Sequence, residues 1–232
     1  MLDVNGKIEL KGNAFAVSST LAVTANHNLD NITVKILVAN EVNRELEFPK
    51  SSVRVVVKSR CDISEDWALL SILEGDPFPV HASIAHEEEL PSIGHKIFIK
   101  DYPIDLSGIT ETKLTLRSTH SKVTQYNTRP GEDKKTTKKR PRIVADAEFV
   151  ADSKRDEYEV VVEIGRFGGS CGAPYFNERG QVFAFHVASI SESDPGSSVS
   201  EGSHVSYSVG RVLCRLPNFM SCWRDATRSP SL

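Results

Sequence analysis

One glycine-rich stretch of the sequence combines a nucleophile with a backbone that could hold negative charge. It covers residues 168–174 and places Cys171 among three glycines. Glycines allow sharp bends with positive φ, so consecutive N–H groups can point into one concavity that accepts an anion. A cysteine there could attack a carbonyl while its own N–H and that of Gly169 hold the developing oxyanion. The alternative for this stretch alone is a glycine-rich turn around a buried, inert cysteine.

Two more residues could complete this chemistry. A cysteine nucleophile is activated by a nearby histidine, and His27 directly follows an apolar run at residues 21–24. A histidine base is oriented by a carboxylate, and Asp66 directly precedes another apolar run at residues 67–70. The alternatives are a structural histidine at a strand end and a surface aspartate at a strand start.

Four motifs together resemble the trypsin/chymotrypsin superfamily of peptidases. The family pattern has a Gly-x-Gly-Phe-like opening strand, then Thr-Ala-x-His, Asp-x-Ala-Leu-Leu and Gly-x-Ser/Cys-Gly-Gly-Pro. Here these motifs read Gly12-Asn13-Ala14-Phe15, Thr24-Ala25-Asn26-His27, Asp66-Trp67-Ala68-Leu69-Leu70 and Gly169-Ser170-Cys171-Gly172-Ala173-Pro174. They follow the family's order over essentially the whole chain, with Asp66 39 residues after His27 and Cys171 105 residues after Asp66. The resemblance implies an endopeptidase triad of His27, Asp66 and Cys171 that acts on a polypeptide substrate and needs no metal or organic cofactor.

The cysteine at the family's serine position is similar to that of the chymotrypsin-fold cysteine proteases of picornaviruses and related viruses. Those enzymes carry a Gly-x-His-x-x-Gly stretch whose histidine lines the specificity pocket. His186 lies 15 residues after Cys171, although neither flanking glycine is kept, and Val187 and Ala188 would lie beside it. Arg166 falls where the pocket wall would be, so the resemblance implies cleavage after Glu or Gln, with Glu slightly preferred. The alternative for His186 is a core histidine, and the alternative for Arg166 is a surface salt bridge.

These groups need a scaffold, and the rest of the sequence indicates β-strands. About a dozen short runs of β-branched and apolar residues are separated by Gly, Pro, Asn and Asp, which is typical of an all-β protein. With the resemblance, this pattern predicts two six-stranded antiparallel β-barrels of the chymotrypsin-like type. The first would carry His27 and Asp66, and the second would carry Cys171 and the specificity pocket.

The domain boundary and the last secondary-structure element are predicted from local features of the sequence. An acidic, polar stretch ends at Pro91, which predicts an N-terminal barrel at residues 1–90 and a C-terminal barrel with a helix at residues 91–232. Apolar residues recur with helical spacing at residues 209–216 and on towards residue 223, so we expect one C-terminal helix there. Another strand is the alternative for this segment.

The composition is that of an ordinary globular protein. The chain has 232 residues, of which 39% are hydrophobic and 25% charged, and its formal net charge is −3. This charge gives no general attraction to nucleic acid or to anionic membranes, and no apolar run approaches the ~18 residues of a membrane-spanning helix. Asp3 and Lys7 occupy the region where a signal peptide would be apolar, so we expect an intracellular location, in the cytoplasm or the nucleus.

The cysteines are too few and too scattered for a disulfide framework, and their spacing matches no zinc site. Apart from Cys171 they are Cys61, Cys214 and Cys222, and each is expected to be a buried, inert free thiol.

A basic segment from Lys134 to Arg142 is a candidate for weak contact with nucleic acid or an acidic partner, but its composition favours a solvated insertion between two strands. Two alternatives to a peptidase therefore remain. One is a catalytically inactive protease-fold domain that binds peptides or acts as a scaffold, and the other is a nucleic-acid-binding domain.

Overall fold

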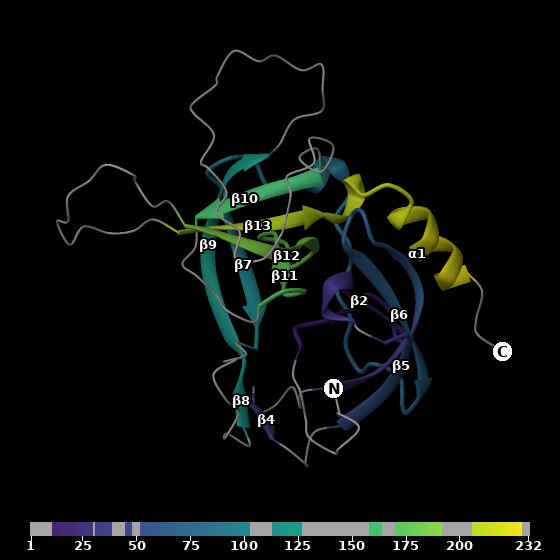
Figure 1. Ribbon diagram of the computed structural model, residues 1–232. Helices are drawn as coiled ribbons and strands as arrows, with labels where there is room; N and C mark the ends of the chain where they lie inside the picture. Colours follow the sequence, from purple (N-terminus) through teal and green to yellow (C-terminus); the bar gives the residue numbers. More distant parts are fainter. Residues whose placement is uncertain are drawn as a thin grey trace.

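The computed structural model describes residues 11–29, 31–38, 45–47, 52–102, 113–126, 158–163, 170–191 and 206–228. This part of the chain consists of strands, three short 3₁₀ turns and one α-helix (Figure 1). Gly169, Arg166 and the basic segment 134–142 lie outside the described residues.

The N-terminal strands form an antiparallel five-stranded sheet in the order β1-β2-β6-β5-β3. They are β1 (Phe15–Ala16), β2 (Leu21–Ala25), β3 (Thr33–Val38), β5 (Ser52–Asp62) and β6 (Trp67–Glu74). All of β2 and the first half of β6 are buried, which explains their nearly unbroken apolar sequences. The short strand β4 (Glu45–Glu47) pairs with β8 (Lys113–Thr115) instead of joining this sheet. In the described part of the chain, the predicted first barrel is thus a five-stranded sheet with an additional strand pair.

The later strands close into the predicted six-stranded barrel, in the order β10-β13-β12-β11-β7-β9. They are β7 (Lys96–Asp101), β9 (Arg117–Tyr126), β10 (Glu159–Glu163), β11 (Pro174–Phe176), β12 (Val182–Ser191) and β13 (Ser206–Val212). Apolar side chains such as Ile97, Val160 and Phe183 fill the interior. A barrel this narrow has room only for side chains, so functional groups must lie at its rim.

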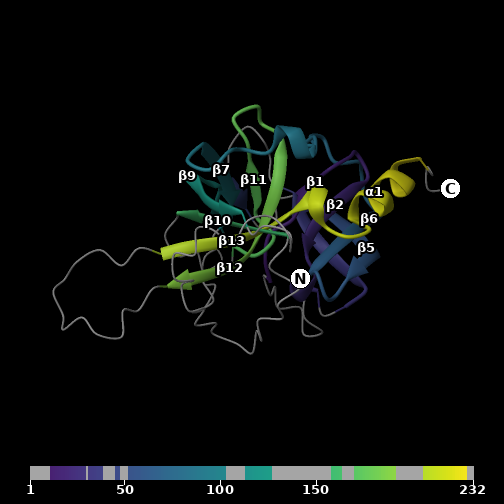
Figure 2. The same cartoon turned by 90° about the horizontal axis from the view of Figure 1, so that it is seen from above.

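The helix α1 (Phe219–Arg228) packs on the N-terminal sheet, beside β5 and β6 (Figures 1 and 2). Phe219 meets Trp67 of β6 edge to face, with ring centroids 5.2 Å apart. Both rings belong to a core cluster that also contains Val23 of β2 and Phe185 of β12. The sheet and the barrel therefore share one hydrophobic core, which fixes the surface between them.

The prediction of one C-terminal helix is confirmed, but its position was wrong. Residues 206–212 form β13, and the 3₁₀ turn η4 (Leu213–Arg215) separates this strand from α1. Val209, Arg211 and Val212 are all buried, so both faces of β13 are covered. Buried apolar residues continue with helical spacing through Leu213 and Leu216, and this spacing alone does not distinguish the end of the strand and η4 from a buried helix. Among the described residues, no helix has the length and the apolar character needed to cross a membrane.

Candidate active site

His27 and Asp66 meet where two neighbouring strands end. Ala25, the last residue of β2, pairs with Trp67, the first residue of β6. His27 lies in the 3₁₀ turn η1 (Asn26–Asn28); its N–H donates to Asp66 Oδ1 at 2.9 Å, and its Nδ1 lies 2.7 Å from Oδ2. Asp66 has a φ of 56°, a left-handed conformation that Asp adopts more readily than most residues. One carboxylate therefore holds both the backbone and the ring of His27.

The backbone of Cys171 is held against this turn by the N-terminal half. Its carbonyl accepts hydrogen bonds from the Asn13 N–H at 2.7 Å and from the Asn28 side chain at 3.0 Å. The next residue, Gly172, has a φ of 86°, and a Cβ there would lie 2.0 Å from the Asn13 carbonyl oxygen. Only glycine permits this conformation and this approach. Because Asn28 is the neighbour of His27, these contacts bring Cys171 to the imidazole.

The ring of His27 contacts both Asp66 and Cys171. Hydrogen bonding of the ring to the Asp66 carboxylate, and then to Cys171, raises the pKa of His27 from 6.5 to about 10, against the opposing effect of burial. The imidazole is therefore protonated at neutral pH. The side chain of His27 is 39% exposed and that of Asp66 only 6%, so the ring faces solvent while the carboxylate is covered.

A bulge in β12 faces the sulfur of Cys171. His186 pairs with Gly210 and Ala188 pairs with Val209 of β13, so Val187 is the extra residue. The carbonyl of Val187 accepts a hydrogen bond from the thiol form of Cys171, with Sγ and O 3.6 Å apart. Bulges redirect backbone groups next to functional sites. This one brings a carbonyl acceptor to the side of the nucleophile.

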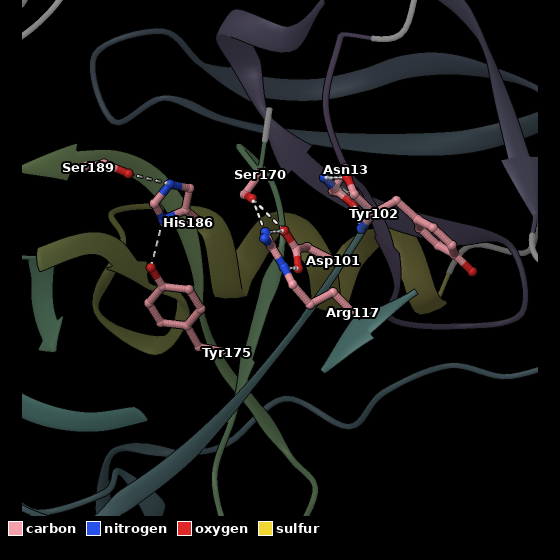
Figure 3. A network of polar contacts seen from close by, with 8 residues as sticks. All are labelled: Asn13, Asp101, Tyr102, Arg117, Ser170, Tyr175, His186 and Ser189. Atoms are coloured by element: carbon pink, nitrogen blue, oxygen red, sulfur yellow. Dashed lines mark hydrogen bonds and ion pairs between the residues drawn. The ribbon is translucent and has the colours of Figure 1, made fainter. Parts of the chain in front are cut away.

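His186 occupies a buried polar position next to the same turn. Its side chain lies between Tyr175, whose hydroxyl oxygen is 2.8 Å from Nδ1, and Ser189, whose hydroxyl oxygen is 3.4 Å from Nε2 (Figure 3). Burial lowers the pKa of His186 to about 4, so the ring is neutral at physiological pH. Burial also raises the pKa of Tyr175, which keeps its proton. With the phenol as donor to Nδ1, the imidazole carries its own proton on Nε2.

The structure brings together the three residues predicted to carry the chemistry, and two of the predicted pocket residues adjoin them. The N–H of Gly172 donates to the His186 carbonyl at 2.8 Å, and Val187 contacts the sulfur of Cys171. Ala188 is exposed on the same strand. Of the two predicted oxyanion donors, Gly169 lies outside the described residues. Within them, no carbonyl accepts from the Cys171 N–H.

The remaining cysteines are free thiols, as predicted, but they are not all buried. Cys61 is exposed, and Cys214 and Cys222 are half-buried. The prediction of burial was wrong for Cys61 because it lies at the exposed end of β5, where the pattern of apolar residues has already ended.

Sequence reasoning missed the residues that support the site. Asn13 and Asn28 hold the Cys171 carbonyl, and Tyr175 holds His186. Asn28 and Cys171 are 143 residues apart, and an asparagine near a turn is too common to indicate such a contact. A further group beneath the turn, Asp101 with Arg117 and Ser170, was also missed (Figure 3).

Comparison with known proteins supports the fold. No protein-family model and no curated protein sequence matches the chain. Among solved structures, the chain is similar to the MamO protease domain from Magnetospirillum magneticum in its apo form, at 11% sequence identity and a TM-score of 0.53. The match covers 97% of this chain and 93% of the other. The predicted fold class is thereby confirmed: the chain has the chymotrypsin-like double-barrel fold.

Proposed function

We propose that the chain is a cysteine endopeptidase in which Cys171 is the nucleophile, His27 the acid–base group and Asp66 the residue that orients it. The observation that carries this proposal is the placement of the His27 ring, which lies 2.7 Å from the Asp66 carboxylate and near enough to Cys171 for that residue to raise its pKa as well. Nucleophile, base and orienting acid in hydrogen-bond reach form the arrangement that activates a cysteine for attack on a carbonyl. The active site would then belong with those of picornavirus-type cysteine proteases.

The reaction would proceed through a thioester. The Cys171 thiolate attacks the scissile carbonyl carbon, and the carbonyl electron pair moves onto the oxygen, where the N–H groups of Cys171 and Gly169 would hold it. The intermediate collapses as the C–N bond breaks and the His27 imidazolium donates its proton to the leaving amine. A water molecule then attacks the thioester with His27 as the base, which releases the acid and restores the thiol. The proton transfers all pass through His27, so no metal ion or organic cofactor is required.

The surroundings of His186 support a preference for Glu or Gln before the scissile bond. A neutral imidazole with its proton on Nε2 can donate a hydrogen bond to the side-chain oxygen of either residue. The contact from Nε2 to Ser189, at 3.4 Å, is long enough to give way to such a ligand. The carbonyl of Val187, beside the sulfur, would accept the substrate's backbone N–H, with Ala188 next to it on the exposed strand. A slight preference for Glu over Gln rests on Arg166 and follows from sequence alone.

A peptide library tests the proposal when it is profiled with three proteins. Wild type is expected to cleave, preferentially after Glu or Gln, and to lose activity when iodoacetamide alkylates Cys171. Cys171→Ala is expected to be inactive. Cys61→Ala removes an exposed thiol elsewhere and is expected to behave as wild type. Cleavage that survives in Cys171→Ala would overturn the proposal, and peptide binding without cleavage by wild type would identify an inactive binding domain.

A further inference from the structure

An ion pair with a buried carboxylate lies next to Ser170, the residue before Cys171 (Figure 3). Asp101 is the last residue of β7 and Arg117 the first of β9, and the two are partners in the strand register. Arg117 Nε donates to Asp101 Oδ1 at 3.0 Å, and Arg117 Nη2 donates to Oδ2 at 2.5 Å. The hydroxyl of Ser170 donates to the same Oδ2 at 2.5 Å, and Arg117 Nη2 also lies 3.3 Å from the Ser170 oxygen. Ser170 directly precedes Cys171, so the ion pair is hydrogen-bonded to the turn that carries the nucleophile.

Asp101 and Ser170 are buried, so the contact between them holds the turn in place and is not a surface contact. Asp101 and Ser170 are each 1% exposed, while the side chain of Arg117 is 32% exposed. A buried carboxylate is costly unless its oxygens are fully occupied, and here a bidentate guanidinium and a hydroxyl occupy them. The Ser170 hydroxyl therefore has one favourable direction, and that direction sets the start of the turn.

The same end of β7 also reaches Cys171 by a second route. Asn13 accepts from the Tyr102 N–H at 2.8 Å and donates to the Tyr102 carbonyl at 3.1 Å, and Tyr102 is the residue after Asp101. The N–H of Asn13 in turn donates to the Cys171 carbonyl. The peptide units on both sides of the turn are thus tied to one strand end, Ser170 through Asp101 and Cys171 through Asn13. Fixing both ends fixes the direction of the Cys171 N–H between them.

We propose that Asp101 and Arg117 are positioning residues that, through Ser170, hold the Cys171 turn in the geometry that aims its N–H at the substrate's carbonyl oxygen. This inference rests on the proposed cysteine peptidase function and adds two residues to it. Neither residue would touch the substrate. Their effect would fall on the step in which the oxyanion forms, and not on the basicity of His27 or the formation of the thiolate.

The test separates oxyanion stabilisation from thiolate formation. Alkylation by iodoacetamide needs the thiolate but no oxyanion donor, whereas peptide hydrolysis needs both. In Asp101→Asn we expect kcat to fall at least about tenfold with KM nearly unchanged, because a donor that is misaimed loses part of its effect. The rate and the pH profile of Cys171 alkylation are expected to remain within about twofold of wild type. Arg117→Lys, which cannot form the bidentate pair, is expected to give a smaller loss of the same kind.

Three further variants keep the result decisive. Ser170→Ala removes only the link; it is expected to lower kcat as Asp101→Asn does, and the double variant is expected to lose little more than either single one. Should Asp101→Asn fail to fold, Ser170→Ala decides the question alone. Glu159→Gln is the matched control, because Glu159 pairs with the buried Arg211 of the same barrel at 2.9 Å on strands β10 and β13. It is expected to lower the Tm without changing kcat.

The outcomes distinguish this inference from the function on which it rests. Loss of hydrolysis and of alkylation in equal proportion, with a lower Tm, would mean that Asp101 only stabilises the fold and would overturn the positioning role. An unchanged kcat in Ser170→Ala would do the same. If wild type itself shows no hydrolysis that depends on Cys171, the peptidase proposal fails first.

Discussion

The N-terminal sheet and the barrel each contribute a histidine beside Cys171, and the surroundings of the two rings give them opposite properties. His27, on the N-terminal sheet, lies at the surface with a carboxylate 2.7 Å from its ring, and its pKa is raised to about 10. His186, on the barrel, is buried with a phenol as partner, and its pKa is lowered to about 4. At neutral pH one imidazole carries a charge and the other does not.

This difference suits two separate tasks. A protonated ring beside a thiol stabilises the thiolate and has a proton ready for the leaving amine. A neutral ring whose tautomer is fixed can donate one hydrogen bond of defined direction without attracting every anion. The comparison teaches that the surroundings of each ring, a carboxylate beside His27 and burial around His186, set its protonation state although the residue type is the same.

Replacement of His27 should lower the activity most. In His27→Gln we expect kcat to fall by about a thousandfold or more, because both the activation of Cys171 and the protonation of the leaving group are lost. The fold should be retained, since the ring is 39% exposed. Steady-state kinetics on a cleaved library peptide, together with a thermal melt, measure both. Activity within tenfold of wild type would show that His27 is not the acid–base group, and its contrast with His186 would then have no functional meaning.

Exchange of its carboxylate partner should have the next largest effect. Asp66→Asn keeps the shape but removes the first cause of the raised pKa, so the pKa of His27 falls and the protonated imidazole covers a narrower pH range. We expect a loss of about a hundredfold or more in kcat and slower alkylation of Cys171 at pH 7. Alkylation rates from pH 5 to 10 provide the measurement. A profile identical to that of wild type would show that Asp66 does not control His27.

The groups that meet in this site were predictable from sequence to different degrees. His27 and Asp66 each adjoin an apolar strand, and Cys171 lies among glycines, so local sequence marks all three. The strands β2 and β6 were predictable for the same reason. The contacts of Asn13, Asn28 and Tyr175, by contrast, join distant segments through common residue types, and only the folded chain identifies them.

The type of secondary structure was predicted wrongly in β13, where the residues are buried on both faces. The inward and outward faces of β13 are both covered, and the buried residues Val209, Val212, Leu213 and Leu216 recur with helical spacing, so a helix was predicted. Ser170 shows the same limit at the level of one side chain. It reads as a small residue before the nucleophile, yet its hydroxyl is 1% exposed and bonded to Asp101.

Changes on the barrel side should affect substrate choice more than turnover. In His186→Gln we expect kcat/KM for Glu and Gln peptides to fall about tenfold or more, the size expected for one lost hydrogen bond in a buried site. Peptides with other residues at that position should change little. Tyr175→Phe, which leaves the ring in place but removes the partner of Nδ1, should give a smaller loss in the same direction. An unaltered library profile in both variants would leave His186 as a core histidine.

The smallest expected effect is on the free energy of unfolding. His186 should change it in the acidic range, and His27 should change it in the alkaline range. The folded protein keeps His186 neutral down to about pH 4, whereas the unfolded chain protonates it below pH 6.5. Below that value the unfolded state binds more protons, so acidification lowers the free energy of unfolding by up to about 1.4 kcal/mol per pH unit. His27 behaves in the opposite way, because its pKa is raised. Its stabilising contribution is complete below pH 6.5 and is lost as the pH rises through about 10.

Denaturant unfolding of wild type, His186→Gln and His27→Gln across the pH range separates these contributions from those of the other ionisable groups, which the three proteins share. Relative to wild type, His186→Gln should gain stability steadily from pH 6.5 towards pH 4 and run parallel to wild type above that range. His27→Gln should run parallel below pH 6.5 and show a weaker loss on the alkaline side. A constant difference between wild type and His186→Gln from pH 7 to pH 5 would mean that the ring takes up a proton in the folded state. The contrast between a charged and a neutral imidazole would then fail on the barrel side, and with it the argument for recognition of Glu or Gln by a neutral donor.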